Sequence, residues 1–304
     1  MKKLVTHNGG FHADDIVAYA ILQEVLTKRG QSWTLSRSRD PLVISQGDIV
    51  FDVGDVYDDT IGRYDHHQTG RAGVRENGIY YASAGLVWKH FGRELCNSDK
   101  VHNDIDKFFI SPIDAADNGQ DMIREMNFED VGVGGFNTLL NVFNPTLFED
   151  KSESTLLQCF NDAVRVTRIF VSKLVHTQNA LYEAHKQALA WYEQSSDKQV
   201  LVFEKNYERS IWIKLSELPE PLFVIYPESR SGTWKAEIIR KHPVTFEARV
   251  PFPESWAGLT GTELQKVTGV PDAQFCHPGR FLCGADSIAG IKQLVSLALS
   301  AHTK

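Results

Sequence analysis

Three short segments in the first quarter of the chain are rich in histidine or aspartate, and each follows an apolar run: residues 6–15 and 63–68, which carry both, and residues 51–55, which carry two aspartates. In an α/β sheet, residues just past the carboxyl ends of neighbouring strands converge on one crevice, so segments that are distant in sequence can meet there. The pattern therefore predicts an α/β fold with a single site at one edge of a sheet.

The apolar runs before these segments have the length of short strands. Strands are predicted over residues 2–6, 33–37, 48–52 and 62–65, and a helix over residues 15–28, where apolar residues recur near helical spacing. We expect a largely parallel sheet flanked by helices in this part of the chain.

The chain has 304 residues, more than one compact core usually holds. Residues 154–194 have a helical pattern without proline or glycine, which predicts one very long helix or two in series. Short β-like runs follow at 200–204, 210–215, 222–226 and 234–239, before a closing helix. We therefore expect a first domain over 1–195 that includes a long helical connection, and an α+β domain over 196–304.

A net charge of −7 argues against a broad basic surface for long nucleic acid, but it leaves room for a local basic pocket. No apolar stretch suits a signal peptide or a membrane span, so we expect a cytoplasmic protein without a membrane partner. The segment with Gly132, Gly134 and Gly135 lacks the lysine and hydroxyl of a phosphate loop. Aromatic residues of the second half are expected mainly in the core: Trp212, Phe223, Tyr226, Trp234, Phe246, Phe252 and Trp256.

The acidic and histidine residues near the predicted strand and helix ends have the donor types of a metal site. Imidazole with several carboxylates suits manganese or magnesium better than a closed structural zinc site. The simpler alternatives are a helix cap at Asp14 or Asp15, a buried salt bridge at Asp52, and a turn carboxylate at Asp117, with Asp114 as its weaker rival. The predicted ligands are His7, His12, Asp14, Asp52, His66 and Asp117.

Basic residues outside these segments are candidates for binding substrate. Arg37 and Arg39 can clamp a phosphate, because guanidinium binds such oxyanions in a two-pronged manner; an Arg–Asp pair that holds a loop is the alternative. In the second half, His277 and Arg280 lie in a loop that can present substrate-binding groups.

Taken together, these motifs resemble the DHH phosphoesterase superfamily, and more closely its MYG exonuclease branch. The similarity extends over most of the chain and rests on residues 6–9 with Phe11, His12 and Asp14, and on residues 37–41, 52–54, 64–68, 83–86, 114–119 and 144–146.

The resemblance implies a hydrolase with two divalent cations, expected as manganese with magnesium as the alternative. It implies that Asp52 bridges the ions, that His66 and Asp117 bind one of them, and that His67 contacts a phosphate. His7, His12 and Asp14 complete the ligand set. Paired cations of this kind activate a water and stabilise the leaving oxygen. The expected catalytic residues are Asp65, His67 and Arg39, and the expected substrate-binding residues are His67, Arg37, Arg39, His277 and Arg280.

The expected function is phosphoester hydrolysis that depends on a divalent metal, in the form of an exonuclease on single-stranded RNA or short oligonucleotides. A small-molecule phosphatase or pyrophosphatase is the enzyme alternative, and a metal-binding regulatory protein without turnover is the alternative of a different class. The expected partner is a short single-stranded nucleic acid or nucleotide. The sequence leaves the oligomeric state open, a homodimer included.

Overall fold

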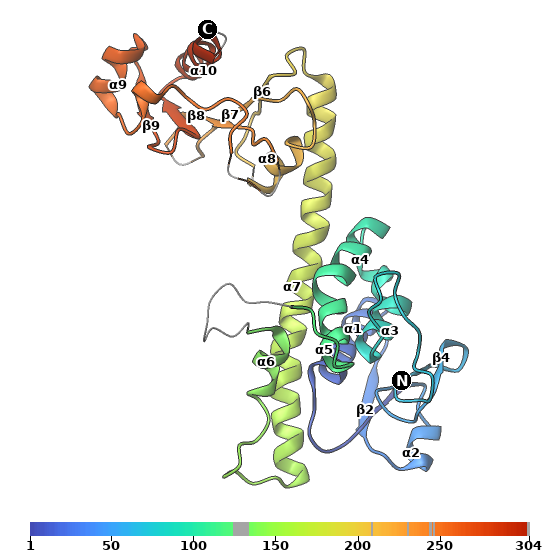
Figure 1. The fold of residues 1–304 in the computed structure, drawn as a ribbon. Helices are drawn as coiled ribbons and strands as arrows, with labels where there is room; N and C mark the ends of the chain where they lie inside the picture. The colour runs from blue at the N-terminus through green and yellow to red at the C-terminus, as the bar shows by residue number, and fades with distance from the viewer. Residues whose placement is uncertain (124–133, 208, 230, 243–244, 246, 303–304) are drawn as a thin grey trace. The chain divides into compact units, whose positions relative to one another are not determined.

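A computed structural model describes residues 1–123, 134–207, 209–229, 231–242, 245 and 247–302, and Figure 1 shows its ribbon. Two compact units comprise residues 1–180 and 181–304, so they divide inside helix α7 (Glu153–Gln194) and not at its end near residue 195. The reason is packing: Ala184, Ala188, Trp191 and Tyr192 of α7 contribute to a hydrophobic cluster of the second unit. The helical pattern over 154–194 is one continuous helix.

The first unit contains a five-stranded sheet that is largely parallel, as the sequence predicts. Its strands are β1 (Lys2–Thr6), β2 (Trp33–Arg37), β3 (Ile49–Phe51), β4 (Tyr57–Asp58) and β5 (Arg63–Tyr64). They lie in the order β2-β1-β3-β5-β4. The pairs β1–β2, β1–β3 and β3–β5 are parallel, and β4–β5 is antiparallel. The carboxyl ends of β1, β3 and β5 consequently share one edge.

Helices cover this sheet and continue its core. They are α1 (Ala13–Lys28), α2 (Pro41–Ser45), α3 (Ser83–Phe91), α4 (Asp99–Ile105), α5 (Ser111–Asp117) and α6 (Phe136–Asn141). A π-helical turn, Asp106–Ile110, joins α4 to α5. Every residue of α1 from Ala13 to Leu22 is buried. The helix lies in the core of the first unit, where α3 and α5 contact it.

The second unit is built on a mixed five-stranded sheet in the order β6-β7-β8-β10-β9. Its strands are β6 (Val200–Val202), β7 (Phe223–Pro227), β8 (Trp234–Ile238), β9 (Ala273–Cys276) and β10 (Leu282–Ala285), and its helices are α8 (Arg209–Leu215), α9 (Gly261–Thr268) and α10 (Ile288–His302). The strand predicted over 210–215 is wrong, because α8 occupies these residues. Ile211, Trp212 and Leu215 share a helical face and are buried in the hydrophobic cluster.

The aromatic residues of the second unit are mostly in its core, as expected. Trp212, Phe223, Tyr226, Phe252 and Trp256 are buried, and Trp234 packs against them partly exposed. Gly132 and Phe246 lie outside the described residues. None of the helices in the described part of the chain, α7 included, is both long and apolar enough to cross a membrane.

Candidate metal centre

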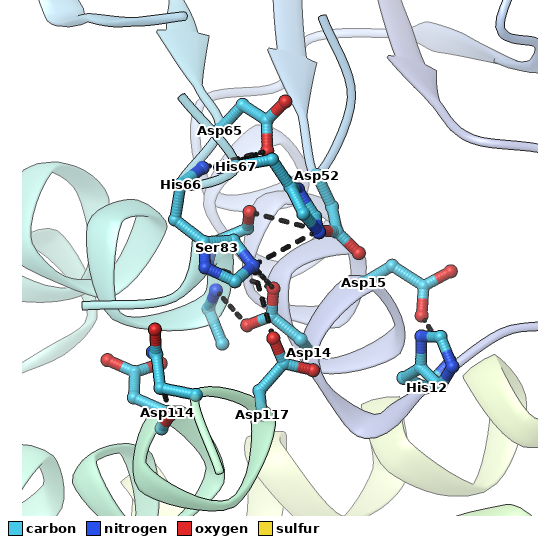
Figure 2. A network of polar contacts seen from close by, with 12 residues as sticks. His12, Asp14, Asp15, Asp52, Asp65, His66, His67, Ser83, Asp114 and Asp117 are labelled. Carbon is cyan, nitrogen blue, oxygen red and sulfur yellow. Dashed lines mark hydrogen bonds and ion pairs between the residues drawn. The ribbon is translucent and has the colours of Figure 1, made fainter. Parts of the chain in front are cut away.

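The three histidine and aspartate segments meet at the shared edge of the first sheet. His7 follows β1, Asp52 follows β3, and residues 65–67 follow β5. Figure 2 shows the side chains of the second and third segments close to those at the start of α1. His7, Asp14, Asp15, Asp52 and His66 are all at least nine-tenths buried. Because isolated buried charges are costly, so many of them in one place must be paired with one another or with cations.

The first group of candidate ligands consists of His7, Asp15 and Asp52. His7 Nε2 lies 3.2 Å from Asp52 Oδ2 and 3.5 Å from Asp15 Oδ2. Asp52 has a φ of +54°, a left-handed conformation that aspartate tolerates better than most residues, and it redirects the chain directly after β3. Burial and the nearby Asp52 carboxylate raise the pKa of Asp15 to about 7, although His7 opposes them.

The second group consists of Asp14, His66 and Asp117. His66 Nε2 lies 3.1 Å from Asp117 Oδ2, 3.6 Å from Asp52 Oδ1 and 3.8 Å from Asp14 Oδ2. Burial alone would lower the pKa of His66, but the carboxylates of Asp117 and Asp52 beside Nε2 outweigh burial and raise this pKa to about 11. Asp52 therefore faces the second group through Oδ1 and the first group through Oδ2.

The donor atoms converge on common points, which fits bound cations. His66 Nε2 and Asp15 Oδ2 are buried and make no well-formed hydrogen bond with the described residues, although oppositely charged groups lie within 4 Å of each. A buried nitrogen or oxygen atom that lies near several other metal-binding groups, without a hydrogen bond to any of them, is suited to bind an ion held between these groups. Imidazole and carboxylate donors of this kind fit manganese or magnesium.

Asp14 is fixed by the start of α3. Its Oδ2 accepts a hydrogen bond from the backbone N–H of Ser83 at 2.9 Å, and its Oδ1 accepts one from Ala84 N–H at 2.6 Å. These N–H groups have no partner within their own helix, and the positive end of the helix dipole favours a carboxylate there. The contact joins α1 to α3 and holds Asp14 beside His66.

Asp65 orients the histidine pair. Its Oδ1 accepts backbone hydrogen bonds from His66 N–H at 2.7 Å and His67 N–H at 3.3 Å, and its Oδ2 accepts one from Asp55 N–H at 2.6 Å. Asp65 Oδ1 also lies 2.7 Å from His67 Nδ1, and this hydrogen bond is the main cause of the raised pKa of His67. Because Nδ1 faces Asp65, Nε2 of the half-exposed His67 is left for a ligand.

Asp114 and Asp117 have different environments at the end of α5. Asp114 is fully buried, pairs with Arg75 at 2.7 Å, and accepts a hydrogen bond from Gly85 N–H at 2.9 Å. A Cβ atom at Gly85 would come within 1.8 Å of Asp114 Oδ2, so this packing requires glycine. Asp114 thus holds α3 against α5, whereas Asp117 contributes to the second ligand group.

Among the described residues, a third group of candidate ligands consists of Asp52, Asp65, His66 and His67, and His12 belongs to none of the three. It is the exposed cap residue of α1, and its backbone N–H donates to Asp15 Oδ1 at 2.8 Å (Figure 2). Asp15, which the sequence indicated only as a helix cap, stands with His7 in the first group. It serves both roles, since Oδ1 caps the helix while Oδ2 faces His7. Asp15 is fully buried, and this burial, which the sequence does not show, distinguishes it from an ordinary helix cap.

The two arginines after β2 also differ. Arg37 donates to the carbonyl oxygens of His7 at 3.2 Å and Gly9 at 2.9 Å, and its guanidinium lies 4.2 Å from the Phe160 ring centroid. These contacts place Arg37 in the support of the ligand-bearing turn. Arg39 is exposed and lines a cavity of about 380 Å³, together with His12, Asp52, His67 and Asp117 among others.

His277 and Arg280 belong to the second unit. His277 Nδ1 accepts a hydrogen bond from Gly279 N–H at 2.9 Å, and its ring lies 4.2 Å from that of Phe281. Arg280 has a φ of +56° and lines a separate cavity of about 660 Å³ with other basic residues. Their assignment to substrate binding stays a prediction.

The fold and the site define a class of protein: an α/β protein with buried histidine and aspartate groups, suited to divalent cations, at the carboxyl edge of a largely parallel sheet. Within that class, the chain belongs to the MYG1_exonuc family, described as an uncharacterised protein family (UPF0160), whose model matches residues 3–299. The family resemblance read from the motifs is thereby confirmed.

Relatives of similar length occur in bacteria and animals. A protein named MYG1 protein from Chlamydia pneumoniae is 30% identical over 290 residues, covering 92% of this chain and 91% of that protein. A protein named MYG1 exonuclease from Mus musculus is 27% identical over 326 residues, covering 98% of this chain and 85% of that one.

A solved structure of RecJ in complex with Mn²⁺, from Thermus thermophilus, matches at 12% identity with a TM-score of 0.29. The match covers 98% of this chain and 52% of that one, so this chain spans about half the length of RecJ.

Proposed function

We propose that this chain is a phosphoester hydrolase that depends on divalent cations, and that it acts as an exonuclease on single-stranded RNA or short oligonucleotides. The observation that carries the proposal is the position of Asp52, whose two carboxylate oxygens face two separate histidine and aspartate groups. One carboxylate shared by two such groups is the arrangement of a paired-cation centre. Membership in a family whose relatives include proteins named exonuclease supports the reaction class.

In this proposal, His7, Asp15 and Asp52 hold one cation, and Asp14, Asp52, His66 and Asp117 hold the other. We assign manganese to both positions, with magnesium as the alternative, on the basis of these oxygen and imidazole donors. When bound, such a pair lowers the pKa of a water and offsets the charge that develops on the phosphate.

The chain's own residues orient the substrate around this centre. Asp65 holds His67 through Nδ1 and raises the pKa of the ring, so that the protonated His67, which lines the cavity, can donate Nε2–H to a phosphate oxygen or to the leaving oxygen. Arg39, on the same cavity wall and without a hydrogen bond or ion pair among the described residues, supplies a guanidinium for a second phosphate oxygen. Asp65 positions His67 and does not itself face the substrate.

The size of the cavity and the net charge of the protein favour binding of one end of a nucleic acid strand over binding of a long stretch. The cavity of about 380 Å³ is near the lower end of the range for small-molecule sites, about 300 to 1,000 Å³. The net charge of −7 does not suit a protein that holds many consecutive phosphates. A short single-stranded terminus that enters the cavity is consistent with both the cavity volume and the net charge. The cytoplasmic location stays a prediction from sequence.

The direct test is hydrolysis of a short 5′-labelled single-stranded RNA in manganese, beside a dinucleotide and pyrophosphate. His66→Ala removes the histidine of the second ligand group and serves as the blank, and His176→Ala, on an exposed position of α7, is the matched control. We expect a ladder of shortened RNA with wild type and the control, and none with His66→Ala.

Turnover of pyrophosphate alone would instead indicate a small-molecule hydrolase. Intact substrates in every reaction, with two bound cations per chain measured by elemental analysis, would indicate a metal-binding protein without turnover. A full ladder with His66→Ala would show that the nuclease activity does not depend on this centre.

A further inference from the structure

Helix α6 contributes a neutral polar wall to the cavity at the metal centre. Asn137 and Asn141 are four residues apart, so they lie on the same face of the helix, and both line the cavity with Asp52 and Asp117. Helix α6 contacts α1 and α5, the two helices that carry the candidate ligands Asp14, Asp15 and Asp117. The amides therefore face the same space as the cation ligands.

The amide of Asn137 has an unused hydrogen-bonding atom. Its Oδ1 is shielded from solvent and has no hydrogen-bond partner among the described residues. A buried acceptor without a partner is unfavourable, so such atoms in native proteins usually await a ligand, an ion or an ordered water. Because Asn137 lines the cavity, rotation of its amide would bring Oδ1 to the cavity surface, where the hydroxyl or N–H group of a ligand can provide the missing hydrogen bond.

The other groups on the wall restrict which part of a nucleotide reaches the amides. The guanidinium of Arg39 is positively charged and attracts a phosphate, whereas an uncharged amide competes poorly for an anion. Among the described residues that line the cavity there is no phenylalanine, tyrosine or tryptophan on which a base could stack. The sugar, which is joined directly to the phosphate, is the neutral polar group that remains.

We propose that Asn137 and Asn141 bind the hydroxyl groups of the ribose next to the phosphate that is hydrolysed, and so select ribonucleotides over deoxyribonucleotides. The 2′-hydroxyl is both a donor and an acceptor, and it distinguishes RNA from DNA at a single position. Asn137 Oδ1 accepts a hydrogen bond from the 2′-hydroxyl, while Asn141 donates its amide N–H to the oxygen of the same hydroxyl. This inference rests on the proposed function, because it concerns the same cavity.

The test compares kcat/KM in manganese for a ribo-oligonucleotide and a deoxyribo-oligonucleotide of the same sequence. We expect wild type to favour the ribo-substrate, and Asn137→Ala to lower kcat/KM for that substrate by roughly 5- to 10-fold, the effect of one lost hydrogen bond. The value for the deoxyribo-substrate should stay the same. Thr138→Ala, at a position of α6 that does not line the cavity, is the matched control. Asn141→Ala should act like Asn137→Ala with a smaller effect.

Other outcomes overturn the inference. An unchanged ratio of the two kcat/KM values in Asn137→Ala would show that the Asn137 amide does not distinguish ribose from deoxyribose. An equal loss for both substrates, with less manganese bound per chain, would make Asn137 a cation ligand.

A wild type that hydrolyses neither oligonucleotide would refute the proposed function. The inference is then tested by binding of a ribonucleoside and a deoxyribonucleoside monophosphate in manganese. A preference for the ribonucleotide that disappears in Asn137→Ala supports it, and equal affinities refute it.

Discussion

Replacing Asp15 with asparagine is expected to stabilise the protein when cations are absent and to weaken its cation binding. Asp15 is fully buried, and its Oδ2 has no hydrogen bond among the described residues. Asparagine has nearly the same shape and retains an oxygen that can accept the hydrogen bond from His12 N–H. The substitution therefore removes a buried negative charge and little else.

The size of the effect follows from the pKa of Asp15, which is raised from 3.8 to about 7 by burial first and by Asp52 second. A shift of about three units corresponds to roughly 4 kcal/mol between the two protonation states. Because the folded state holds the proton more tightly, the stability of wild type falls as the pH rises from about 4 to about 7 and then levels off. The asparagine variant lacks this loss, so its advantage is about 1 to 2 kcal/mol at pH 5 and about 4 kcal/mol at pH 8.

The assay is urea unfolding in EDTA at pH 5 and pH 8, followed by manganese titration calorimetry at pH 8. The exposed Asp121 provides the control variant, Asp121→Asn, which removes the same charge without relieving burial. We expect manganese to reverse the order of stability, since a ligand stabilises the form that binds it more tightly. An Asp15→Asn protein that is less stable than wild type in EDTA at pH 8, or that binds manganese with wild-type affinity, would refute the reasoning.

Further predictions concern the cations, the cavity and the turn that supports them. Asp52→Asn should reduce bound manganese from two ions per chain to one or none and abolish hydrolysis, as elemental analysis and the RNA assay would show; two bound ions would contradict the bridging role. Manganese affinity of wild type should rise between pH 6 and pH 8, because Asp15, with a pKa of about 7, must lose its proton to bind; a flat calorimetric profile would count against this. Arg39→Ala should raise KM for RNA roughly 10-fold with unchanged manganese content, as expected for one lost charge-assisted contact to phosphate. Asn144→Ala should lower the free energy of unfolding by about 1 to 3 kcal/mol, because the Asn144 amide forms hydrogen bonds with both the N–H and the carbonyl of Phe11. A variant as stable as wild type in urea unfolding would show that these hydrogen bonds contribute little.

Much of the first unit was predictable because its information is local. Short apolar runs that end in polar residues predicted β1, β2, β3 and β5, and the parallel arrangement of such strands predicted that the segments after β1, β3 and β5 would meet. The uninterrupted helical pattern predicted helix over 154–194 but left open whether it formed one helix or two, and the structure has one. The strand predicted over 210–215 failed because a short apolar run suits a strand and a buried helix equally, and only packing decides between them.

The sequence by itself therefore determined most strands and helices of the first unit, the kinds of donor atom and the edge of the sheet where they gather. Only the tertiary structure decided how the donors are divided. Asp14 and Asp15 are adjacent on α1, yet the contact of Asp14 with the start of α3 turns it toward His66, while Asp15 faces His7. Side-chain direction at a helix terminus depends on the neighbouring elements, and residues as far apart as Phe11 and Asn144 help to set it. The spacing of residues along the chain does not show those contacts. The sequence could therefore predict the types of ligand, but not which ligands lie together in each group.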